Sequence, residues 1–139
     1  MNGAPLWCQK YVGLPFLDGG RTTRGIDCWG LVRLVFAEEK GIELPTYGDV
    51  SASDLRAIAE AIEAEIEKHE TWLPAHPALP QPFDVVIMKR REKPVHIGVL
   101  VTESKMLHVE EATAAIIVDL DGRTIKQRVS KILRHRSFA

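Results

Sequence analysis

The sequence predicts an α+β fold in which N-terminal helices pack on a C-terminal antiparallel β-sheet of about five strands. Up to His69 the apolar residues recur at helical spacing, whereas from Phe83 onward short apolar runs bounded by charged or turn-forming residues indicate strands. Between these parts, four prolines in residues 73–82 disfavour both a helix and a central strand, so we expect a stiff, extended connector. A run of helices followed by a run of strands is typical of α+β layer folds.

Size and composition predict one domain over residues 1–139, with a helical part at about 1–70, the connector at 73–82 and the sheet at 83–139. The chain has 139 residues, 45% of them hydrophobic, which suffices for one hydrophobic core. A formal net charge of −1 predicts no general attraction to nucleic acid. The basic residues after Asp121 are better explained as a solvated strand face than as an anion-binding surface.

The N-terminal residues predict no export signal, and the chain as a whole predicts no membrane span. Met1 to Val12 contain no basic stretch followed by an apolar run, and no window approaches the ~18 apolar residues of a transmembrane helix. We therefore expect cytoplasmic synthesis without a signal peptide. The two cysteines, Cys8 and Cys28, are expected to be reduced thiols, because two cysteines in a chain of this size do not suggest a disulfide framework.

The first strong helix is expected to begin at Cys28 and to end at Gly41. Asp27 can cap the free backbone amides of its first turn, and an apolar stripe follows at helical spacing, formed by Leu31, Leu34 and Val35. A second helix is expected to start near Ser51, where Ser51 and Asp54 resemble a capping box. Its apolar face, under an acidic outer face, consists of Leu55, Ile58, Ala59, Ile62 and Ile66.

Five apolar runs after the connector predict the strands of the antiparallel sheet. Several of them alternate between apolar and polar residues, as half-buried strands do. The predicted strands are 83–88, 95–101, 106–109, 115–120 and 129–134.

Cys28 is the candidate nucleophile because of its position. A thiol in the first turn of a helix lies at the positive end of the helix dipole, which favours the thiolate over the thiol. Cys8 has no such environment and is expected to be a small buried hydrophobe. Amide cleavage also needs a group that protonates the departing amine, so an imidazole must lie near the thiol.

His96 and His108 are the candidate imidazoles, because each lies inside a predicted strand. If Gly98 pairs with His108 across a three-residue loop, His96 and His108 share one sheet face as diagonal neighbours, and Gly98 leaves room between them. A loop of even length would place them on opposite faces. The predicted roles are attack by Cys28, proton exchange by His96 and orientation of His96 by His108.

Three stretches of the sequence carry a family resemblance. They are the segment Gly13-Leu14-Pro15-Phe16 with Gly19-Gly20, the segment from Gly25 to Val32, and His96-Ile97-Gly98-Val99 followed after twelve positions by His108. In combination they resemble the signature of the NlpC-type family, papain-like cysteine peptidases that cut the peptide stems of bacterial cell walls. The resemblance implies a papain-like fold, no cofactor, and catalytic roles for Cys28, His96 and His108.

Two positions depart from the family pattern. Trp29 stands where secreted bacterial members usually have a small Ser, and Phe16 stands where many members have a Tyr whose hydroxyl supports the oxyanion. The loss of one oxyanion donor can raise the barrier by ~3 kcal/mol. The backbone amide of Cys28 remains available, and Tyr11, Asp27 and Trp29 are the neighbouring candidates for oxyanion or substrate contacts.

Trp29, the stretch 41–45 and the ending Arg134-His135-Arg136 are similar to peptidases of phage and prophage tails and gene-transfer agents. This similarity implies a tail-associated enzyme that a particle carries to the cell wall, with tail proteins as further partners. By the same resemblance, the substrate is the peptidoglycan stem peptide and the scissile bond joins D-glutamate to diaminopimelate.

Three alternatives remain open at this point. The Phe16 departure is compatible with an inactive structural tail-tip or assembly module of the same fold. Cys28, His96 and His108 could together bind zinc, although the usual CxxC and HExxH spacings are absent from the sequence. A cytosolic amidase acting on a small amide would use the same residues on a different substrate.

Overall fold

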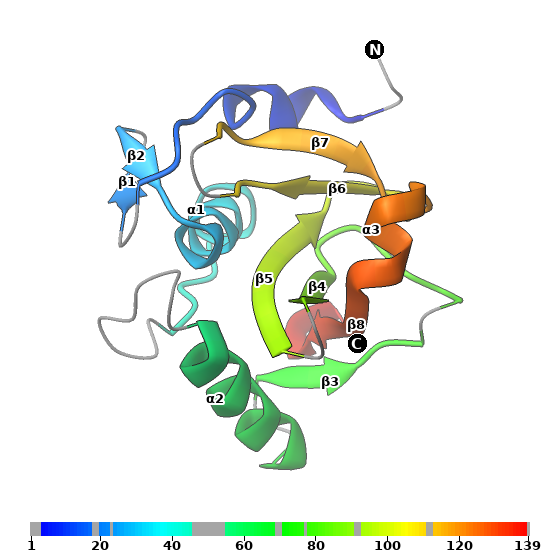
Figure 1. Cartoon of the computed structure of the whole chain (residues 1–139). Coiled ribbons are helices and arrows are strands. Elements are labelled where there is room, and N and C mark those ends of the chain that lie inside the picture. Colours follow the sequence, from blue (N-terminus) through cyan, green and yellow to red (C-terminus); the bar gives the residue numbers. More distant parts are fainter. Residues whose placement is uncertain are drawn as a thin grey trace.

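The fold is built on one antiparallel sheet of six strands, in the order β3-β8-β4-β5-β6-β7 (Figure 1). The computed structural model describes residues 4–17, 20–22, 24–45, 55–68, 71–76, 78–90, 93–110 and 113–138. The strands are β3 (Trp72–Pro74), β4 (Val85–Arg90), β5 (Lys93–Leu100), β6 (Lys105–His108), β7 (Ile116–Asp119) and β8 (Val129–His135). A separate two-stranded hairpin, β1 (Arg21–Thr22) and β2 (Gly25–Ile26), leads into the first long helix.

Helices cover both faces of this sheet. They are the 3-10 helices η1 (Leu6–Lys10) and η3 (Arg136–Phe138) and the α-helices α1 (Cys28–Lys40), α2 (Leu55–Lys68) and α3 (Arg123–Arg128). Figure 1 shows α1 and α2 on one side of β5 and α3 on the other. The predicted α+β class, with N-terminal helices packed on a C-terminal antiparallel sheet, is therefore confirmed. None of the described helices is long and apolar enough to cross a membrane.

The main helix, α1, has the predicted ends. Asp27 Oδ1 accepts a hydrogen bond of 2.7 Å from the Gly30 amide at the N-terminus. At the other end Gly41 adopts the left-handed conformation with φ of 64°, and its amide bonds the carbonyls of Phe36 and Ala37. One face of α1 is fully buried in the main core, through Leu31, Val32, Val35 and Phe36.

The second helix, α2, buries the described central part of its predicted apolar stripe. Ile58 and Ile62 are almost completely buried, whereas Glu60, Glu63 and Glu67 on the outer face are exposed. The described part of α2 begins at Leu55. Its predicted start, with Ser51 and Asp54 as a capping box, lies outside the described residues.

The sheet exceeds the prediction by one strand, which comes from the proline connector. Trp72–Pro74 forms β3 at the edge of the sheet, where it pairs only with β8. An edge position tolerates Pro74, because a strand that pairs on one side leaves backbone positions that need no N–H donor. The remainder of the described connector forms no helix or strand.

Residues 123–128 form the short helix α3, so the prediction of a strand face there was wrong. Ile125 and Val129, four positions apart, both pack on a second apolar cluster on the sheet face opposite α1. The buried members of this cluster are Ala75, Val86, Met88, Leu100, Met106 and Ile132.

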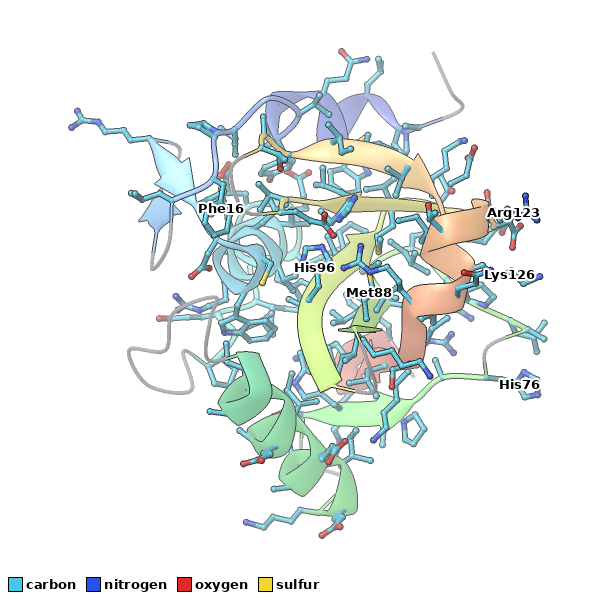
Figure 2. All side chains as sticks on the ribbon, viewed as in Figure 1. Phe16, His76, Met88, His96, Arg123 and Lys126 are labelled. Carbon is cyan, nitrogen blue, oxygen red and sulfur yellow. The ribbon has the colours of Figure 1, made fainter. Side chains whose placement is uncertain are left out.

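Much of the C-terminal basic charge is neutralised by ion pairs. Arg128 bonds Glu110, Lys131 bonds Glu63, and Arg134 bonds Asp84. Arg123 and Lys126 project from the outer edge of α3 (Figure 2). This arrangement agrees with a solvated face rather than an anion-binding surface.

Candidate active site

Cys28 lies at the start of α1 and against the strand that carries His96. The side chain is 2% exposed. The backbone of Ile97, of Trp29 and of Cys28 itself favours the thiolate and lowers the pKa of the thiol. Because Ile97 directly follows His96 in β5, the thiol is seated beside the strand position from which His96 projects.

The Cys28 thiol is protonated at neutral pH. Burial raises its pKa to about 12, and the charge of Asp27 adds to this effect, while the backbone hydrogen bonds oppose it. Desolvation of the buried sulfur thus opposes the helix dipole, which favours the thiolate. Thiolate formation at this site therefore requires a partner that accepts the proton.

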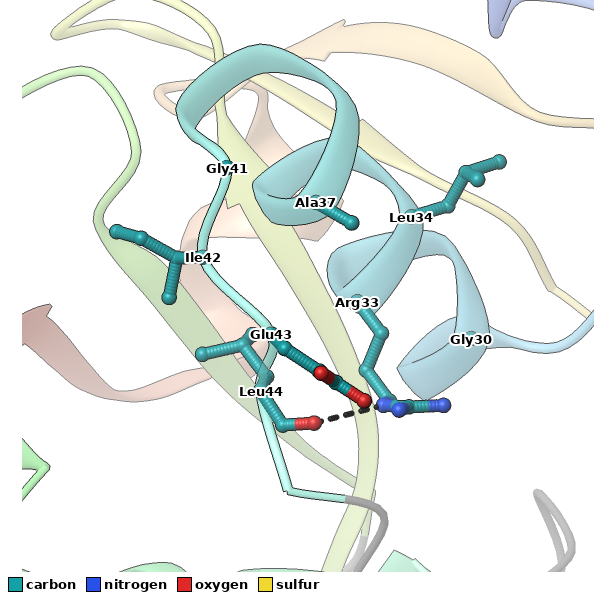
Figure 3. A pocket seen from close by; sticks show the side chains of 8 residues that line it. All are labelled: Gly30, Arg33, Leu34, Ala37, Gly41, Ile42, Glu43 and Leu44. Carbon is teal, nitrogen blue, oxygen red and sulfur yellow. Dashed lines mark hydrogen bonds between the residues drawn. The ribbon is translucent and has the colours of Figure 1, made fainter.

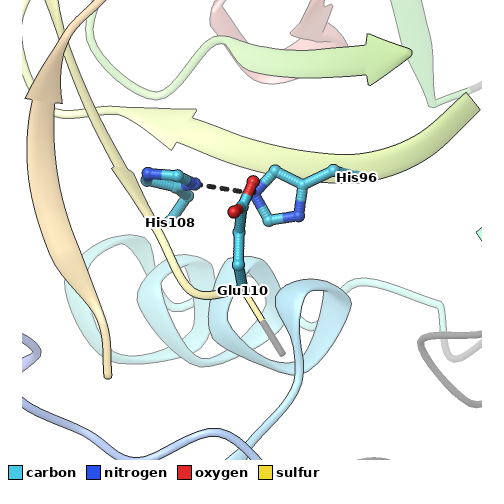
Figure 4. Close-up of side chains that lie close together, drawn as sticks. All are labelled: His96, His108 and Glu110. Atoms are coloured by element: carbon cyan, nitrogen blue, oxygen red, sulfur yellow. Dashed lines mark hydrogen bonds and ion pairs between the residues drawn. The ribbon is translucent and has the colours of Figure 1, made fainter. Parts of the chain in front are cut away.

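The two predicted histidines meet as the hairpin register requires. Val99 pairs with Leu107 and Leu100 with Met106, which is the register that places Gly98 opposite His108. His96 Nε2 and His108 Nδ1 are 2.7 Å apart in a hydrogen bond, and the two rings cross at 68° (Figure 4).

Gly98 provides the space between the two rings. A Cβ atom at residue 98 would lie 2.6 Å from Met106 Sδ and 3.2 Å from His108 Cβ. Any side chain there would displace its neighbours. The prediction that Gly98 leaves room between the histidines is therefore confirmed.

Both imidazoles are neutral at neutral pH. Burial lowers the pKa of His96 far below its ordinary value, and the neighbouring His108 lowers it further. Burial also lowers the pKa of His108. The site therefore rests as a neutral thiol beside a neutral pair of imidazoles, not as a preformed ion pair.

No direct hydrogen bond between Cys28 and His96 occurs among the described contacts. Hydrogen bonds of catalytic groups are often long in free enzymes and tighten when substrate is bound. His108 Nε2 is buried and has no hydrogen-bond partner among the described residues. When His96 Nε2–H donates to His108 Nδ1, the ring proton of the neutral His108 is on its Nε2 atom.

A carboxylate and a guanidinium cover the histidine pair, and the sequence analysis missed both. Glu110 Oε1 lies 3.9 Å from His96 Nε2 and 2.6 Å from Arg128 Nη1 (Figure 4). Strand parity could have found Glu110, because it lies two residues after His108 and therefore on the same side of the extended chain. Arg128 reaches the site only through the position of α3, which the sequence did not predict.

Tyr11 is held at the opposite end of α1. Its ring is 1% exposed, and its hydroxyl donates a hydrogen bond of 2.6 Å to Glu39. Glu39 lies eleven residues after Cys28 on the same helix, which corresponds to about 16 Å along the axis. This geometry argues against an oxyanion role for Tyr11.

Asp27 and Trp29 have buried structural partners. Asp27 is 1% exposed and caps α1 through the Gly30 amide. Trp29 is equally buried, donates from Nε1 to the Pro45 carbonyl, and makes an edge contact with Trp72. The large residue after Cys28 thus joins α1 to β3, and neither side chain is presented to a substrate.

Phe16 lies beside the segment that delivers Cys28. It forms an isolated bridge with Ile26 of β2, and its amide donates to the Thr113 carbonyl. The ring is partly buried and packs against the main core (Figure 2). The position at which many family members have a Tyr is therefore next to the candidate site.

The structure does not group the three residues of the zinc alternative. Among the described residues, the group that could hold a metal ion consists of His96, His108 and Glu110, with ligand atoms within 4.8 Å of one another. Cys28 is not part of this group. The arrangement of the thiol gives no support to a Cys28–His96–His108 metal site.

A shallow hollow of about 320 Å³ lies on the outer side of α1 (Figure 3). It is closed on one side by the hydrogen bond from Arg33 Nε to the Leu44 carbonyl. The lining residues are Gly30, Arg33, Leu34, Ala37 and Gly41 to Leu44, and they include neither Cys28 nor the histidines. This hollow is separate from the candidate site.

Solved structures resemble this fold at low sequence identity. An NlpC/P60 family protein from Bacillus cereus has a TM-score of 0.65 at 16% identity, over 95% of this chain and 41% of that one. A lipoprotein-like protein of the NLP/P60 family from Staphylococcus aureus has a TM-score of 0.61 at 20% identity, over 90% of this chain and 37% of that one. The NlpC/p60 domain of the peptidoglycan hydrolase SagA has a TM-score of 0.58 at 15% identity, over 90% of both chains.

Curated proteins and a family model agree with this likeness. "Probable endopeptidase NlpC homolog" of Haemophilus influenzae is 27% identical over 83% of this chain and 52% of its own length. "Murein DD-endopeptidase MepS/Murein LD-carboxypeptidase" of Escherichia coli K12 is 25% identical over 88% and 56%. The chain thus spans little more than half of these relatives. The model of the NlpC/P60 family matches residues 13–134, so the chain belongs to the NlpC/P60 family.

Proposed function

We propose that this chain is a cysteine peptidase that hydrolyses peptide bonds in the stem peptides of peptidoglycan. Cys28 is the nucleophile, His96 the base and later the acid, and His108 the residue that orients His96. The observation that carries the proposal is a buried thiol at the start of α1 whose pKa the Ile97 backbone influences, while His96, the residue before Ile97 in β5, is hydrogen-bonded to His108.

The resting protonation states define the first step. The Cys28 proton moves to His96 Nδ1 as the sulfur attacks the scissile carbonyl carbon, because both groups are neutral beforehand. The oxyanion forms near the N-terminus of α1, where the Cys28 amide can donate to it. His96 then gives its proton to the departing amine, a thioester remains, and water releases the acid with His96 again as base.

Relatives support the substrate class. The matched proteins include one named as a murein endopeptidase and another named "Gamma-DL-glutamyl hydrolase", from Bacillus subtilis, which is 42% identical over 39% of this chain and 12% of its own length. The first name denotes an endopeptidase of murein, and the second denotes a hydrolase of a γ-DL-glutamyl bond. We propose the bond between D-glutamate and diaminopimelate as the scissile bond.

The decisive experiment digests purified peptidoglycan with the wild type and with Cys28→Ala, and identifies the fragments by mass. We expect stem-peptide fragments cut after D-glutamate from the wild type and none from the variant. Activity that survives in Cys28→Ala would exclude the thiol mechanism. Cleavage of simple amides without cleavage of peptidoglycan would instead identify a small-amide amidase.

A second candidate function is an inactive structural module of the same fold. Two observations favour it: Phe16 lacks the hydroxyl of the family pattern, and burial holds the Cys28 thiol in its protonated form. Alkylation with iodoacetamide at neutral pH separates the two functions. In an enzyme the alkylation of Cys28 should slow when His96 is replaced by Ala, because proton transfer to His96 supports the reaction, whereas the rate of an inert buried thiol should not depend on His96.

We also propose that the protein is associated with a phage-derived tail particle, which brings it to the cell wall. The support is the similarity of Trp29, residues 41–45 and the Arg134-His135-Arg136 ending to tail-borne peptidases. Mass spectrometry of purified particles, with and without particle induction, tests this location. Recovery of the protein only in the soluble cytoplasmic fraction would contradict it.

A further inference from the structure

We propose that Glu110 is a positioning residue of this site, whose carboxylate, held by Arg128, stabilises the imidazolium of His96 while His96 carries the Cys28 proton. This inference rests on the proposed function, because the imidazolium is the state that the peptidase cycle passes through. It addresses a specific need, since His108 is a neutral orienter and a neutral partner stabilises an imidazolium less than a carboxylate does.

The Glu110 carboxylate lies close to the His96 ring, on which the positive charge of the imidazolium appears. Glu110 Oε1 is 3.9 Å from His96 Nε2, the nitrogen that also bonds His108 Nδ1. Figure 4 shows the Glu110 carboxylate beside this hydrogen bond, at the edge of the His96 ring. The His96 side chain is only 6% exposed and that of Glu110 39%, so Glu110 forms the outer layer over the pair.

Glu110 is held from two directions. Its carbonyl accepts a hydrogen bond of 2.6 Å from the Thr113 hydroxyl and one of 3.1 Å from the Thr113 amide, which fixes the turn after β6. Its carboxylate accepts a hydrogen bond from Arg128, the last residue of α3. The anion is therefore positioned before any proton reaches His96.

Glu110 is ionised at neutral pH. Burial opposes its ionisation, but the hydrogen bond from Arg128 and the positive charge that can form on His96 hold its pKa below the ordinary value. The described titratable and charged groups that act on His96 are His108 from β6, Arg128 from α3 and Glu110, which follows β6.

The two outer charges act on His96 in opposite directions. Glu110 favours the protonated imidazole, and Arg128 disfavours it. When Cys28 Sγ–H transfers its proton to His96 Nδ1, the new positive charge is shared with Nε2 and is balanced by the thiolate on one side and Glu110 on the other. No proton moves to Glu110 in this step.

The test compares Glu110→Gln with Arg128→Gln in the full chain. The readout is the rate of Cys28 alkylation by iodoacetamide at neutral pH, measured by mapping the modified peptide. We expect Glu110→Gln to slow alkylation roughly three- to tenfold and Arg128→Gln to accelerate it by a similar factor, because the Arg128 charge directly disfavours the His96 imidazolium and the Thr113 hydrogen bonds still hold Glu110. Matched controls are Glu63→Gln and Lys131→Gln, which remove the same charges from a distant exposed ion pair and should leave the rate unchanged.

Opposite changes of the Cys28 alkylation rate in the two variants support the electrostatic role of Glu110. Equal changes in the same direction would mean that the pair only holds the fold, and unchanged rates would mean that Glu110 does not act on His96. Either result overturns the inference. Alkylation of Cys8, which is completely buried, serves as an internal check for unfolding.

A second measurement keeps this inference distinct from the proposed function. In a Cys28→Ala background, NMR titration of the His96 imidazole reports its protonation without any enzyme activity. We expect the titration to move to higher pH in Arg128→Gln and to lower pH in Glu110→Gln. A failure to digest peptidoglycan together with these shifts would reject the peptidase and retain the Glu110–His96 coupling. Normal digestion without the shifts would reject the coupling alone.

Discussion

At the scale of single residues, burial decides the chemical state of the candidate site. The Cys28 thiol has a raised pKa and the two imidazoles have lowered ones, so the groups are neutral before substrate arrives. A preformed ion pair would need the charges to be stabilised in a nearly dry environment, which is costly without close partners. In the proposed mechanism the proton transfer from Cys28 to His96 is therefore coupled to attack on the substrate.

This arrangement predicts an unusual pH dependence. An imidazole with the ordinary pKa of about 6.5 would lose about nine-tenths of its neutral form by pH 5.5. Because burial lowers the pKa of His96 far below that value, the base remains available, and kcat/KM at pH 5.5 should stay above half of its value at pH 7.5.

The measurement is a pH series of initial rates on stem-peptide fragments. Circular dichroism at each pH serves as the control, because histidines with lowered pKa values favour the unfolded state once the pH falls below about 6.5. A tenfold loss of activity at pH 5.5 in a fully folded sample would show that His96 titrates normally.

At the scale of elements, the start of α1 combines a structural cap with an electrostatic effect. Asp27 Oδ1 satisfies the Gly30 amide, and the same carboxylate raises the pKa of the adjacent Cys28 thiol after the larger effect of burial. The Asp27 carboxylate thus stabilises the helix but makes the Cys28 thiol less acidic.

Two substitutions separate the capping effect of Asp27 from the effect of its charge. Asp27→Asn keeps an oxygen acceptor for Gly30 and removes the charge, so it should retain most of the stability and speed iodoacetamide alkylation of Cys28 severalfold. Asp27→Ala removes the cap as well and should lower the free energy of unfolding by about 1–2 kcal/mol. Urea unfolding and peptide mapping provide the two readouts. Slower alkylation in Asp27→Asn would show that the Asp27 charge does not disfavour the thiolate.

The elements also show where sequence patterns were sufficient. Residues 28–41 have a cap, an apolar stripe and a terminating glycine, and α1 forms with those ends. The register of the β5–β6 hairpin was narrowed to an odd or an even loop, and the structure has the odd loop, which places His96 and His108 on one face. Residues 123–128 have no such local pattern. The feature that favours a helix there is the contact of Ile125 with the second apolar cluster, which is a tertiary contact.

At the scale of the whole molecule, a buried ion pair connects segments fifty residues apart. Arg134 of β8 makes two hydrogen bonds of 2.9 Å to Asp84, which is completely buried just before β4. Arg134 Nη2 also donates to the Leu79 carbonyl, and Asp84 Oδ2 accepts from the Gln81 amide. Arg134 in the basic ending 134–136 therefore has a structural function.

Removal of one partner should leave a buried charge without compensation. Arg134→Met is expected to lower the free energy of unfolding by about 3–5 kcal/mol, and Asp84→Asn in the same chain should recover part of the loss. Lys131→Met is the matched control, because it breaks an exposed pair worth about 1 kcal/mol or less. Chemical denaturation measures all four proteins. A loss in Arg134→Met no larger than in Lys131→Met would show that the Asp84 carboxylate needs no buried partner.

The sequence by itself determined the α+β class and the cap and course of α1, and it named the odd-loop hairpin as the register in which His96 and His108 would share a face. These features follow from local patterns of three or four residues and from strand parity. Only the tertiary structure decided that the thiol rests protonated, that Tyr11 bonds Glu39, and that Glu110 and Arg128 cover the histidines. The physical reason is that burial and charge contacts depend on elements far apart in the chain. The local spacing of residues does not indicate which of these elements come into contact.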